Sequence, residues 1–270
     1  MNLVCELEKC TGCGMCSNVC PKNAIEMSEG ERGFVYPKID KNLCIECNLC
    51  RNKCPSNVFQ ATETNVKKVY VSWNKDKKIR KNSSSGGIFT EIAKKIIEQG
   101  GVVCGVAWNE EFHPHHILVN RTKDISKLQG SKYSQSITGD IYKLIKEKLD
   151  KGILILFSGT PCQNAALKSF LGKNYQNLYS IDLVCHGVPS NKMLDNYLFL
   201  FEKDIQNVRL RHKDPFWDYS FVRIDFKDGT KYQKLTIEDD YFNLFNVGFT
   251  LRNSCHNCQY ANTNRKGDIR

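Results

Sequence analysis

The sequence lacks any long apolar segment. Its longest apolar run, Ile153 to Phe157, is only strand-sized, far below the roughly 20 residues that a membrane helix needs. The opening residues, MNLVCELEKC, contain no basic region followed by an apolar core, so they do not resemble a secretory signal. We therefore expect a cytoplasmic protein without a membrane span.

A concentrated basic surface is also missing from the sequence. The formal net charge is +10, but the lysines and arginines are scattered. They form no dense basic helix and are not interleaved with aromatic residues, as they are in proteins that bind single-stranded nucleic acid. We expect no nucleic-acid partner. The alternative, a zinc-binding nucleic-acid module, predicts zinc in place of iron and salt-dependent binding to DNA or RNA.

Cysteine is abundant, with 14 residues, and eight of them form two copies of one pattern. The runs CTGCGMCSNVCP and CIECNLCRNKCP begin at Cys10 and Cys44, and each has the spacing C-x-x-C-x-x-C-x-x-x-C-P. This repeat is typical of bacterial ferredoxins with two 4Fe-4S clusters. Such short spacings in a chain without a signal sequence argue against a secreted disulfide scaffold and indicate a reducing compartment. Anionic clusters would also offset part of the positive charge.

In such ferredoxins the fourth cysteine of each run binds the cluster of the other run. One predicted ligand set is therefore Cys10, Cys13, Cys16 and Cys54, and the other is Cys20, Cys44, Cys47 and Cys50. Gly12 and Gly14 would let backbone N–H groups approach the cluster sulfurs. Two zinc knuckles are the alternative, which two intact copies of the run disfavour. Cys5 lies outside the repeat and is interpreted as a spare buried thiol.

Residues 1–63 are predicted to form this ferredoxin-like domain. We expect a short helix after each Cys-Pro pair, because proline suits the first turn of a helix, and a hairpin over 31–37. Residues 62–68, which are polar and rich in Asn and Lys, would be the linker.

The rest of the chain reads as an α/β domain. Predicted strands cover 69–73, 101–108, 117–119, 153–157, 178–184, 208–212, 221–226 and 231–235, and predicted helices begin near residues 88, 138, 162 and 190. His113, His115 and His116 have a spacing that could bind a metal. We favour the simpler interpretation that they occupy the exposed start of the strand at 117–119.

Four further cysteines lie in the second half of the chain. Cys162 lies in the first turn of a helix, Cys185 follows a buried strand, and Cys255 and Cys258 form a Cys-x-x-Cys pair. A third 4Fe-4S site on these four residues and a structural zinc site on the last two are equally compatible with the spacing. Cys104 falls within a strand and is assigned to the core.

Two polar segments could bind an anionic cofactor. Ser83 to Gly87 precedes an amphipathic helix, where free N–H groups and the helix dipole favour phosphate. An ordinary helix N-cap is the simpler explanation for that segment alone. The segment SKYSQS at 131–136 reads as a polar loop.

The strings SSSGGIFTE, FSGTPCQNAAL, DLVCHGVPS and LRNSCHNCQYA, with RKGDI near the C-terminus, resemble one known family. It is the coenzyme F-420 hydrogenase/dehydrogenase beta subunit family, in its bacterial subgroup with an N-terminal two-cluster ferredoxin. The resemblance implies a noncovalent FAD and a third 4Fe-4S cluster on Cys162, Cys185, Cys255 and Cys258. It also implies that the flavin site is lined by Ser85, Gly86, Gly87, Lys132, Tyr133, Gln135 and Ser136. Similar polypeptides continue past the GDI string, so we expect a fragment or a shortened protein.

We therefore predict an α+β protein, with a ferredoxin-like domain at 1–63 and a larger α/β flavin-binding domain in two parts, 69–152 and 153–270. The predicted function is an iron–sulfur flavoprotein oxidoreductase. It would take electrons from a low-potential donor, such as a ferredoxin or a partner oxidoreductase subunit, and reduce a small-molecule two-electron acceptor. The alternative is a non-catalytic electron-transfer subunit. No catalytic acid or base is assigned. His186 is the best candidate, although a hydrogen bond from it to the third cluster is an equal alternative.

Overall fold

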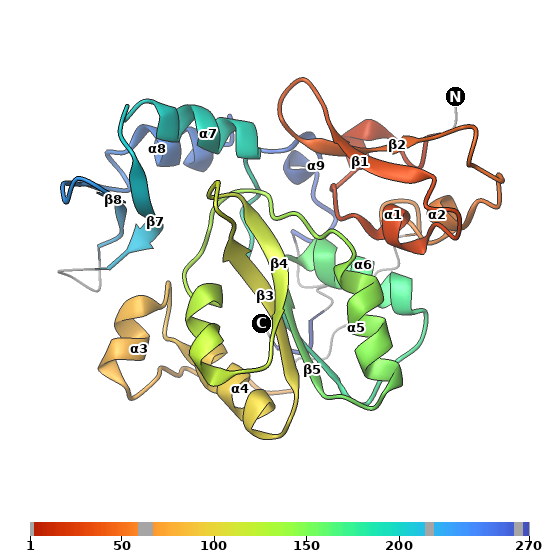
Figure 1. Ribbon diagram of the computed structural model, residues 1–270, viewed down its shortest axis with the longest axis horizontal. Coiled ribbons are helices and arrows are strands. Elements are labelled where there is room, and N and C mark those ends of the chain that lie inside the picture. The colour runs from red at the N-terminus through yellow and green to blue at the C-terminus, as the bar shows by residue number, and fades with distance from the viewer. Residues whose placement is uncertain (1–2, 59–66, 214–218, 262–266, 270) are drawn as a thin grey trace.

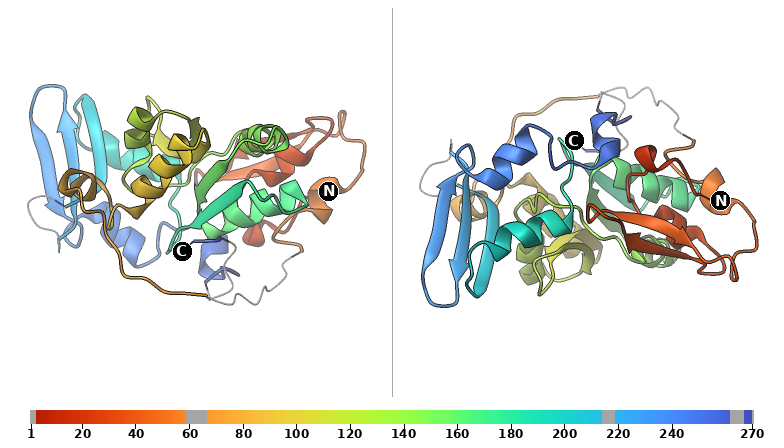
Figure 2. Two further views of the ribbon diagram at one scale, coloured as in Figure 1. Left: turned by 90° about the horizontal axis from the view of Figure 1, so that it is seen from below. Right: turned by 90° about the horizontal axis from the view of Figure 1, so that it is seen from above.

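The computed structural model describes residues 3–58, 67–213, 219–261 and 267–269. Residues 59–63 of the predicted first domain and 62–66 of the predicted linker therefore lie outside the described residues. The described chain forms three neighbouring parts. The ferredoxin-like region and a three-stranded sheet lie at opposite ends, and a four-stranded sheet lies between them (Figures 1 and 2).

The ferredoxin-like region pairs two short helices with one hairpin (Figure 1). Its elements are η1 (Leu7–Lys9), α1 (Met15–Val19), β1 (Ile25–Glu29), β2 (Val35–Ile39) and α2 (Leu49–Asn52). The two strands pair antiparallel with Ile25 opposite Ile39. The predicted hairpin is confirmed, although its turn begins before Glu31 and its second strand starts at Val35.

The predicted position of the two short helices is wrong. Each helix begins one residue before the third cysteine of its run and ends before the Cys-Pro pair, not after it. Cys20, which follows α1, has an extended backbone with φ −69° and ψ 116°. Proline clashes with a helical conformation in the residue before it, so Pro21 stops the helix at Cys20 rather than starting a new one.

The central sheet has the strand order β4-β3-β5-β6. Its strands are β3 (Val102–Trp108), β4 (Pro114–Val119), β5 (Ile155–Gly159) and β6 (Leu178–Asp182). β3, β5 and β6 are parallel neighbours, and β4 adds an antiparallel edge. The strands that precede Cys162 and Cys185, β5 and β6, are therefore neighbours in the sheet.

Helices cover both faces of this sheet. One face packs against α4 (Ile88–Glu98) and η2 (Thr122–Leu128), and the other packs against α5 (Ile141–Asp150) and α6 (Pro161–Leu171). The ferredoxin-like region lies over α5 and α6 and joins their core, because Met15 is 0% exposed and packs in the same cluster as Tyr142 and Leu167. The ferredoxin-like region is thus part of a continuous core rather than a separately packed domain.

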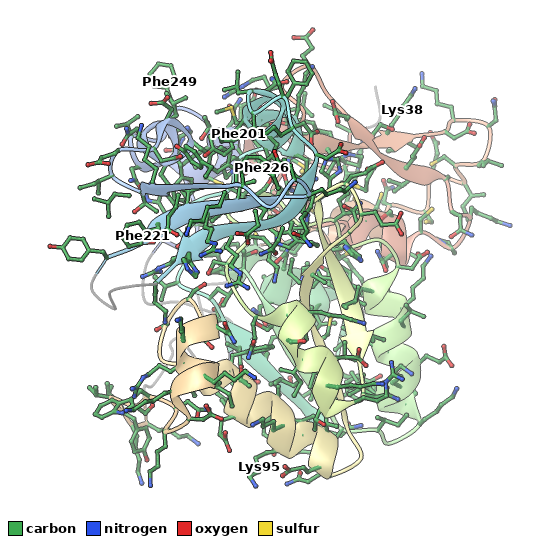
Figure 3. The ribbon with its side chains drawn as sticks, turned by 60° about the vertical axis from the view of Figure 1, so that its left-hand side comes forward. Lys38, Lys95, Phe201, Phe221, Phe226 and Phe249 are labelled. Atoms are coloured by element: carbon green, nitrogen blue, oxygen red, sulfur yellow. The ribbon has the colours of Figure 1, made fainter. Side chains whose placement is uncertain are left out.

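The third part is an antiparallel sheet with helices on one side. Its elements are α7 (Asn191–Phe199), β7 (Ile205–His212), β8 (Phe221–Phe226), β9 (Lys231–Leu235) and α8 (Asp240–Asn246). The last helix, α9 (Asn253–His256), lies beside the ferredoxin-like region and contacts η1 (Figure 1). The order β7-β8-β9 matches the three predicted strands. Phe201 and Phe226 pack together beneath the helices with ring centroids 5.8 Å apart, whereas Phe249 points away from the protein (Figure 3).

One further prediction is corrected by the structure, and one helix was not predicted. Residues 69–73 form no strand: Val69, Tyr70, Val71 and Trp73 are 84%, 75%, 91% and 59% exposed. Their β-branched and aromatic composition favours a strand only where a partner strand is available. The sequence also did not predict α3 (Lys77–Asn82), which Asp76 caps by accepting from the amides of Lys78 and Ile79.

The predicted exposed position of the three histidines is also wrong. β4 begins at Pro114, so His115 and His116 lie within it, and His116 is buried and stacks on Phe157 at 5.6 Å. His113 precedes the strand and is half-buried. The pairing of β4 with β3 places the residues of this segment alternately toward the core and away from it.

Candidate metal centres

Four cysteine thiols line a cavity of about 270 Å³ at the outer end of the ferredoxin-like region. They are Cys20, Cys44, Cys47 and Cys50, the second predicted ligand set. Cys47 is exposed, whereas the other three are half-buried. A set of four thiols without a histidine matches the donors of a 4Fe-4S cluster. The fold therefore brings the last cysteine of the first run to the second run, as the crossed assignment requires.

The other four cysteines of the repeat line a second, narrower pocket. They are Cys10, Cys13, Cys16 and Cys54, and the same pocket is lined by Cys5, Met15 and Met27. The other three thiols of the set lie close enough to Cys16 that their charges help to raise its pKa, after burial as the larger cause. This set lies deeper than the first, since Cys10, Cys16 and Cys54 are buried. The residues present fit a cluster at both positions.

Cys5, unassigned from the sequence, lies against this deeper set. Its thiol hydrogen-bonds with Cys10 and Cys54 and thereby lowers the pKa of both. Cys5 is a fifth thiol beside four predicted ligands. Because Cys5 lies outside the repeat, the cysteine spacing did not predict that its thiol lies beside this set.

The loop that carries the deeper set is held by the body of the protein. The carbonyl of Cys13 accepts from Thr138 Oγ1 at 3.2 Å and from the Tyr142 hydroxyl at 2.9 Å. Gly14 has φ +72°, and a Cβ there would overlap Thr138 Oγ1. The glycine therefore permits both the left-handed backbone and the close approach of Thr138, which precedes α5. The sequence suggested only that this glycine faces a cluster.

The four later cysteines come from three segments that lie near one another. The thiol of Cys162 lies near Cys185, Cys13 and Cys255, whose charges add to burial in raising its pKa. Cys255 lies near Cys258 in turn. Cys162, a member of the predicted third set, therefore lies near Cys13, a member of the deeper ferredoxin set. In the described part of the chain, no three His, Cys, Asp or Glu side chains converge closely enough to hold a single metal ion.

Local geometry explains why Cys162 and Cys185 lie near each other. β5 and β6 are parallel neighbours, so the residues after their carboxyl ends share one edge of the sheet. The turn into α6 is fixed by a capping box, in which Gln163 Oε1 accepts from the Thr160 amide at 3.0 Å. Thr160 Oγ1 lies 3.2 Å from Cys162 Sγ. His186, the candidate proton carrier, packs its ring against Phe245 with centroids 5.0 Å apart.

The C-terminal GDI string anchors this edge. Asp268 Oδ2 accepts from the Ser180 amide at 2.8 Å and from Ser180 Oγ at 2.6 Å. Ile269 forms an isolated parallel bridge with Ile181, and a Cβ on Gly267 would overlap Asp182. These contacts hold the string against β6, which gives it a structural role.

The two segments predicted to line a flavin site contact each other through one hydrogen bond. Ser84 Oγ accepts from the Ser131 amide at 2.7 Å. Beside them, Lys213 donates to the carbonyl of Ser85 at 2.8 Å, and burial lowers the pKa of this lysine to about 8. Gly87 caps α4 with φ +82°. A positive helix end and a lysine therefore lie together, which suits an anionic group.

Four of the predicted flavin contacts have their side chains engaged elsewhere. Lys132 is buried and donates to the carbonyls of Lys127 and Gln129. Tyr133 packs edge-on against Phe242 and Phe245. Gln135 Nε2 donates to the carbonyls of Thr11 and Gly12 in the first cysteine loop, and Ser136 accepts from Gln163. Because these four side chains contact other parts of the protein, the fit to a flavin rests on Ser85, Gly86 and Gly87 with Lys213.

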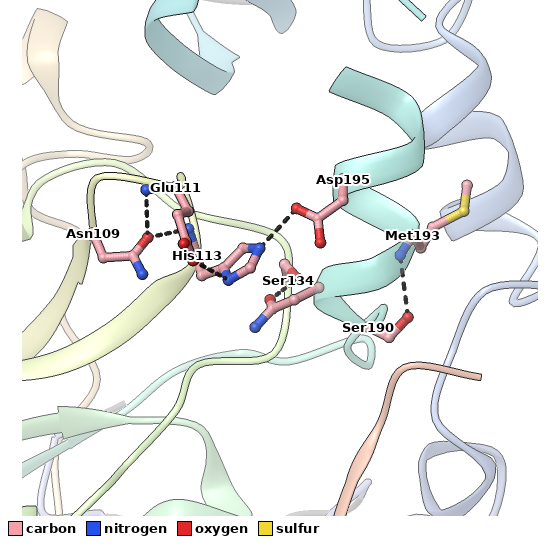
Figure 4. Close-up of polar contacts among 8 residues, drawn as sticks. Asn109, Glu111, His113, Ser134, Ser190, Met193 and Asp195 are labelled. Atoms are coloured by element: carbon pink, nitrogen blue, oxygen red, sulfur yellow. Dashed lines mark hydrogen bonds and ion pairs between the residues drawn. The ribbon is translucent and has the colours of Figure 1, made fainter. Parts of the chain in front are cut away.

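A polar network joins the β3–β4 turn to α7 (Figure 4). His113 Nε2 lies 2.7 Å from Asp195 Oδ1, and its Nδ1 lies 3.6 Å from Glu111. Asn109 Oδ1 accepts from the His113 amide at 2.7 Å. The network fastens the third part of the protein to the central sheet and explains His113 without a metal.

Comparison with known proteins identifies the family of this chain. Residues 9–58 match the 4Fe-4S dicluster domain. Residues 69–142 and 153–270 match the N-terminal and C-terminal portions of the coenzyme F420 hydrogenase/dehydrogenase beta subunit. The chain belongs to the coenzyme F420 hydrogenase/dehydrogenase beta subunit family, with an N-terminal 4Fe-4S dicluster domain. The predicted resemblance is confirmed.

The chain also resembles a subunit of the F(420)H(2) dehydrogenase of Methanosarcina mazei, with 26% identity over 94% of this chain and 72% of that protein. A chain in a xenon-derivatised F420-reducing [NiFe] hydrogenase complex from Methanosarcina barkeri shows 18% identity and a TM-score of 0.44. That match covers 63% of this chain and 62% of the chain in the complex. Among the described residues, no helix is long and apolar enough to cross a membrane.

Proposed function

We propose that this chain is an iron–sulfur electron-transfer oxidoreductase subunit with three clusters. Electrons from a low-potential donor would reach a two-electron acceptor bound by the body of the protein. The observation that carries the proposal is the position of Cys162, which lies near Cys13 of one predicted set and near Cys185 and Cys255 of another. Adjacent cluster sites are what sequential one-electron transfer requires.

The cysteines have defined roles in this proposal. Bound 4Fe-4S clusters would supply reversible one-electron transfer. Cys47, the exposed thiol, marks the edge where a donor protein can approach most closely. Cys10, Cys16 and Cys54 are buried, so a cluster held by the deeper set would be shielded from water. Burial and the number of hydrogen bonds to the sulfurs tune cluster potentials, so the two sets are expected to differ in potential.

The acceptor class is proposed from the family. The named relative belongs to an F(420)H(2) dehydrogenase, which suggests a deazaflavin of the F420 type. FAD, when bound, would convert one-electron steps into a two-electron transfer. We place its anionic portion at the N-terminus of α4, beside Ser85 and Lys213.

One observation favours a second candidate function, a non-catalytic electron-transfer subunit without flavin. The side chains of Lys132, Tyr133 and Gln135 bind other parts of the protein, so the flavin pocket predicted from the resemblance is only partly represented. In this version the chain would hold clusters alone and pass electrons to another subunit.

Anaerobic purification followed by cofactor analysis separates these candidates. Three clusters predict about twelve irons per chain and two predict about eight, from roughly four irons per cluster. Cys162→Ser should lower the iron content by about one cluster, while Cys104→Ser, a change in a core thiol, should not. FAD released on denaturation supports the enzyme and its absence supports the non-catalytic subunit. Reduction assays with F420, NAD(P) and quinones would then identify the acceptor. An iron content of about eight that Cys162→Ser leaves unchanged would refute the third site.

A further inference from the structure

A fully buried arginine lies beside the deeper ferredoxin set. Arg252 is 0% exposed. Its Nε donates to the carbonyl of Cys10 at 2.7 Å, its Nη1 donates to Gln135 Oε1 at 2.8 Å, and its Nη2 donates to the carbonyl of Val35 at 2.8 Å. Burial removes the guanidinium charge from water, which is costly unless the protein compensates for the lost hydration.

No carboxylate among the described residues balances this charge. The hydrogen-bond acceptors of Arg252 there are neutral carbonyl and amide oxygens, apart from Cys10 Sγ at 3.8 Å from Nη2. The rings of Tyr36 and Phe34 lie 4.3 and 5.3 Å from its Cζ. These rings contribute cation–π attraction but carry no negative charge. A buried cation needs an anionic partner, and the thiolate of Cys10 is the anion within reach.

We propose that Arg252 is the counter-charge of the cluster held by Cys10, Cys13, Cys16 and Cys54 and raises the reduction potential of that cluster. The inference rests on the proposed function, specifically on cluster binding by these cysteines. When the cluster accepts one electron from its neighbour, its net charge becomes one unit more negative and no proton is required. A fixed positive charge in a poorly hydrated interior stabilises the more negative, reduced form.

The position of Arg252 in the chain connects this cluster to the third set. The residue directly precedes α9, which contains Cys255, and its carbonyl accepts from the Cys255 amide at 2.8 Å. Its side chain reaches the first cysteine loop, with Nε on the Cys10 carbonyl and Nη2 at 3.8 Å from Cys10 Sγ, while its backbone holds the start of α9. One residue therefore contacts two neighbouring sets. Arg252 acts through the cysteines and is a positioning residue rather than a catalytic one.

The test is a redox titration of the anaerobically purified full chain, followed by electron paramagnetic resonance. Arg252→Gln removes the charge and keeps hydrogen-bond donors, whereas Arg252→Lys keeps the charge. We expect Arg252→Gln to lower the ratio of reduced to oxidised deeper cluster about tenfold at fixed ambient potential, which is about 59 mV for a one-electron couple. Arg252→Lys should retain most of the wild-type potential. The cluster on Cys20, Cys44, Cys47 and Cys50 serves as an internal reference and should not shift.

A second pair of variants keeps the arginine and tests the same idea if Arg252→Gln does not fold. Gln135→Glu places a carboxylate on Nη1 of Arg252 and should lower the same potential, while the neutral Gln135→Met should not. Equal shifts in Arg252→Lys and Arg252→Gln would assign a packing role and overturn the proposal, as would unchanged potentials in Arg252→Gln and Gln135→Glu. A wild-type chain without cluster signals would instead refute the proposed function.

Discussion

Asp239 offers a sharp test of the packing in the third part of the protein. Its carboxylate is 0% exposed and accepts four hydrogen bonds. Oδ2 accepts from the hydroxyls of Tyr197 at 2.7 Å and Tyr232 at 3.0 Å. Oδ1 caps α8 by accepting from the amides of Tyr241 at 3.0 Å and Phe242 at 3.3 Å. One side chain thus ties α7, β9 and α8 together.

The expected cost of Asp239→Ala follows from these contacts. Loss of an N-cap costs about 1 kcal/mol, and a buried hydroxyl left without its acceptor costs about 1–3 kcal/mol. We count only Tyr197 in the second contribution, since Tyr232 is half-buried and can turn to water. The free energy of unfolding should fall by about 3 kcal/mol. At about 2–4 °C per kcal/mol for a chain of this size, the apparent melting temperature should fall by about 6–12 °C.

Matched variants separate the two contributions. Asn is as good an N-cap as Asp, so Asp239→Asn should keep the cap and cost about 1 kcal/mol less than Asp239→Ala. Thermal scans would be run anaerobically at one fixed rate, because unfolding of large proteins is often irreversible. Hydrogen exchange at the amides of Tyr241 and Phe242 gives a local measure, which Asp239→Ala should accelerate and Asp239→Asn should not. A shift below about 1 kcal/mol in both variants would refute the reasoning.

Three further predictions follow from the same kind of contact. Burial lowers the pKa of Lys132 from its usual 10.5 to about 7, so between these pH values the unfolded chain holds a proton that the folded chain lacks. The free energy of unfolding should therefore rise with pH between about 7 and 10.5, by at most about 1.4 kcal/mol per pH unit. Urea titrations of Lys132→Met across this range should show a flatter dependence on pH. Gly14→Ala should lower the free energy of unfolding by about 2–4 kcal/mol, through left-handed strain and overlap with Thr138. Thermal melting of the double variant Gly14→Ala with Thr138→Ala should show a smaller loss, because the overlap is relieved. Equal losses in the single and double variants would exclude the overlap. Cys20→Ser should abolish the same paramagnetic signal as Cys47→Ser and spare the other cluster; loss of the signal that Cys10→Ser abolishes would contradict the crossed assignment.

Local patterns predicted much of the fold. The cysteine spacing placed both ferredoxin sets, and the apolar run at 153–157 with the Ser-Gly-Thr-Pro turn predicted a buried strand followed by a helix. Such signals depend on neighbours in the sequence. The strand predicted at 69–73 failed because its formation depends on a partner strand that no local pattern can report. The helices predicted after each Cys-Pro pair are instead found before it, because proline disfavours a helical conformation in the residue that precedes it.

The surroundings of the candidate site were less predictable than its ligands. Arg252 is three residues before Cys255, and nothing in that spacing indicates that its guanidinium reaches Cys10, which is 242 positions away. Gln135 was predicted as a flavin contact from the family resemblance, yet it donates to the first cysteine loop. Long-range hydrogen bonds of this kind arise from how the layers meet, and a single sequence does not encode which loop faces which helix in any local pattern.

The shared core bears on how the proposed cluster sites work together. A ferredoxin domain on a flexible tether would reach the body at varying distances, and electron transfer between centres is sensitive to distance. Here Met15 packs in the core of α5 and α6, and the carbonyl of Cys13 is held by Thr138 and Tyr142. Arg252 adds three hydrogen bonds to the same region. These contacts fix the deeper cysteine set against the third set independently of the segment that joins the two regions along the chain.

Two kinds of variant test this consequence of the shared core. Inserting a few glycine and serine residues after residue 62 should leave the rate of electron transfer between the deeper and third sites unchanged. Tyr142→Phe removes one of the two hydrogen bonds to the Cys13 carbonyl and should slow that transfer, because the loop that carries the deeper set loses an anchor. Rapid-freeze paramagnetic resonance after mixing with a low-potential reductant measures the rate at which the signal moves between sites. If the insertion slows transfer as much as Tyr142→Phe does, the segment between the regions, and not the shared core, sets the separation of the two sites.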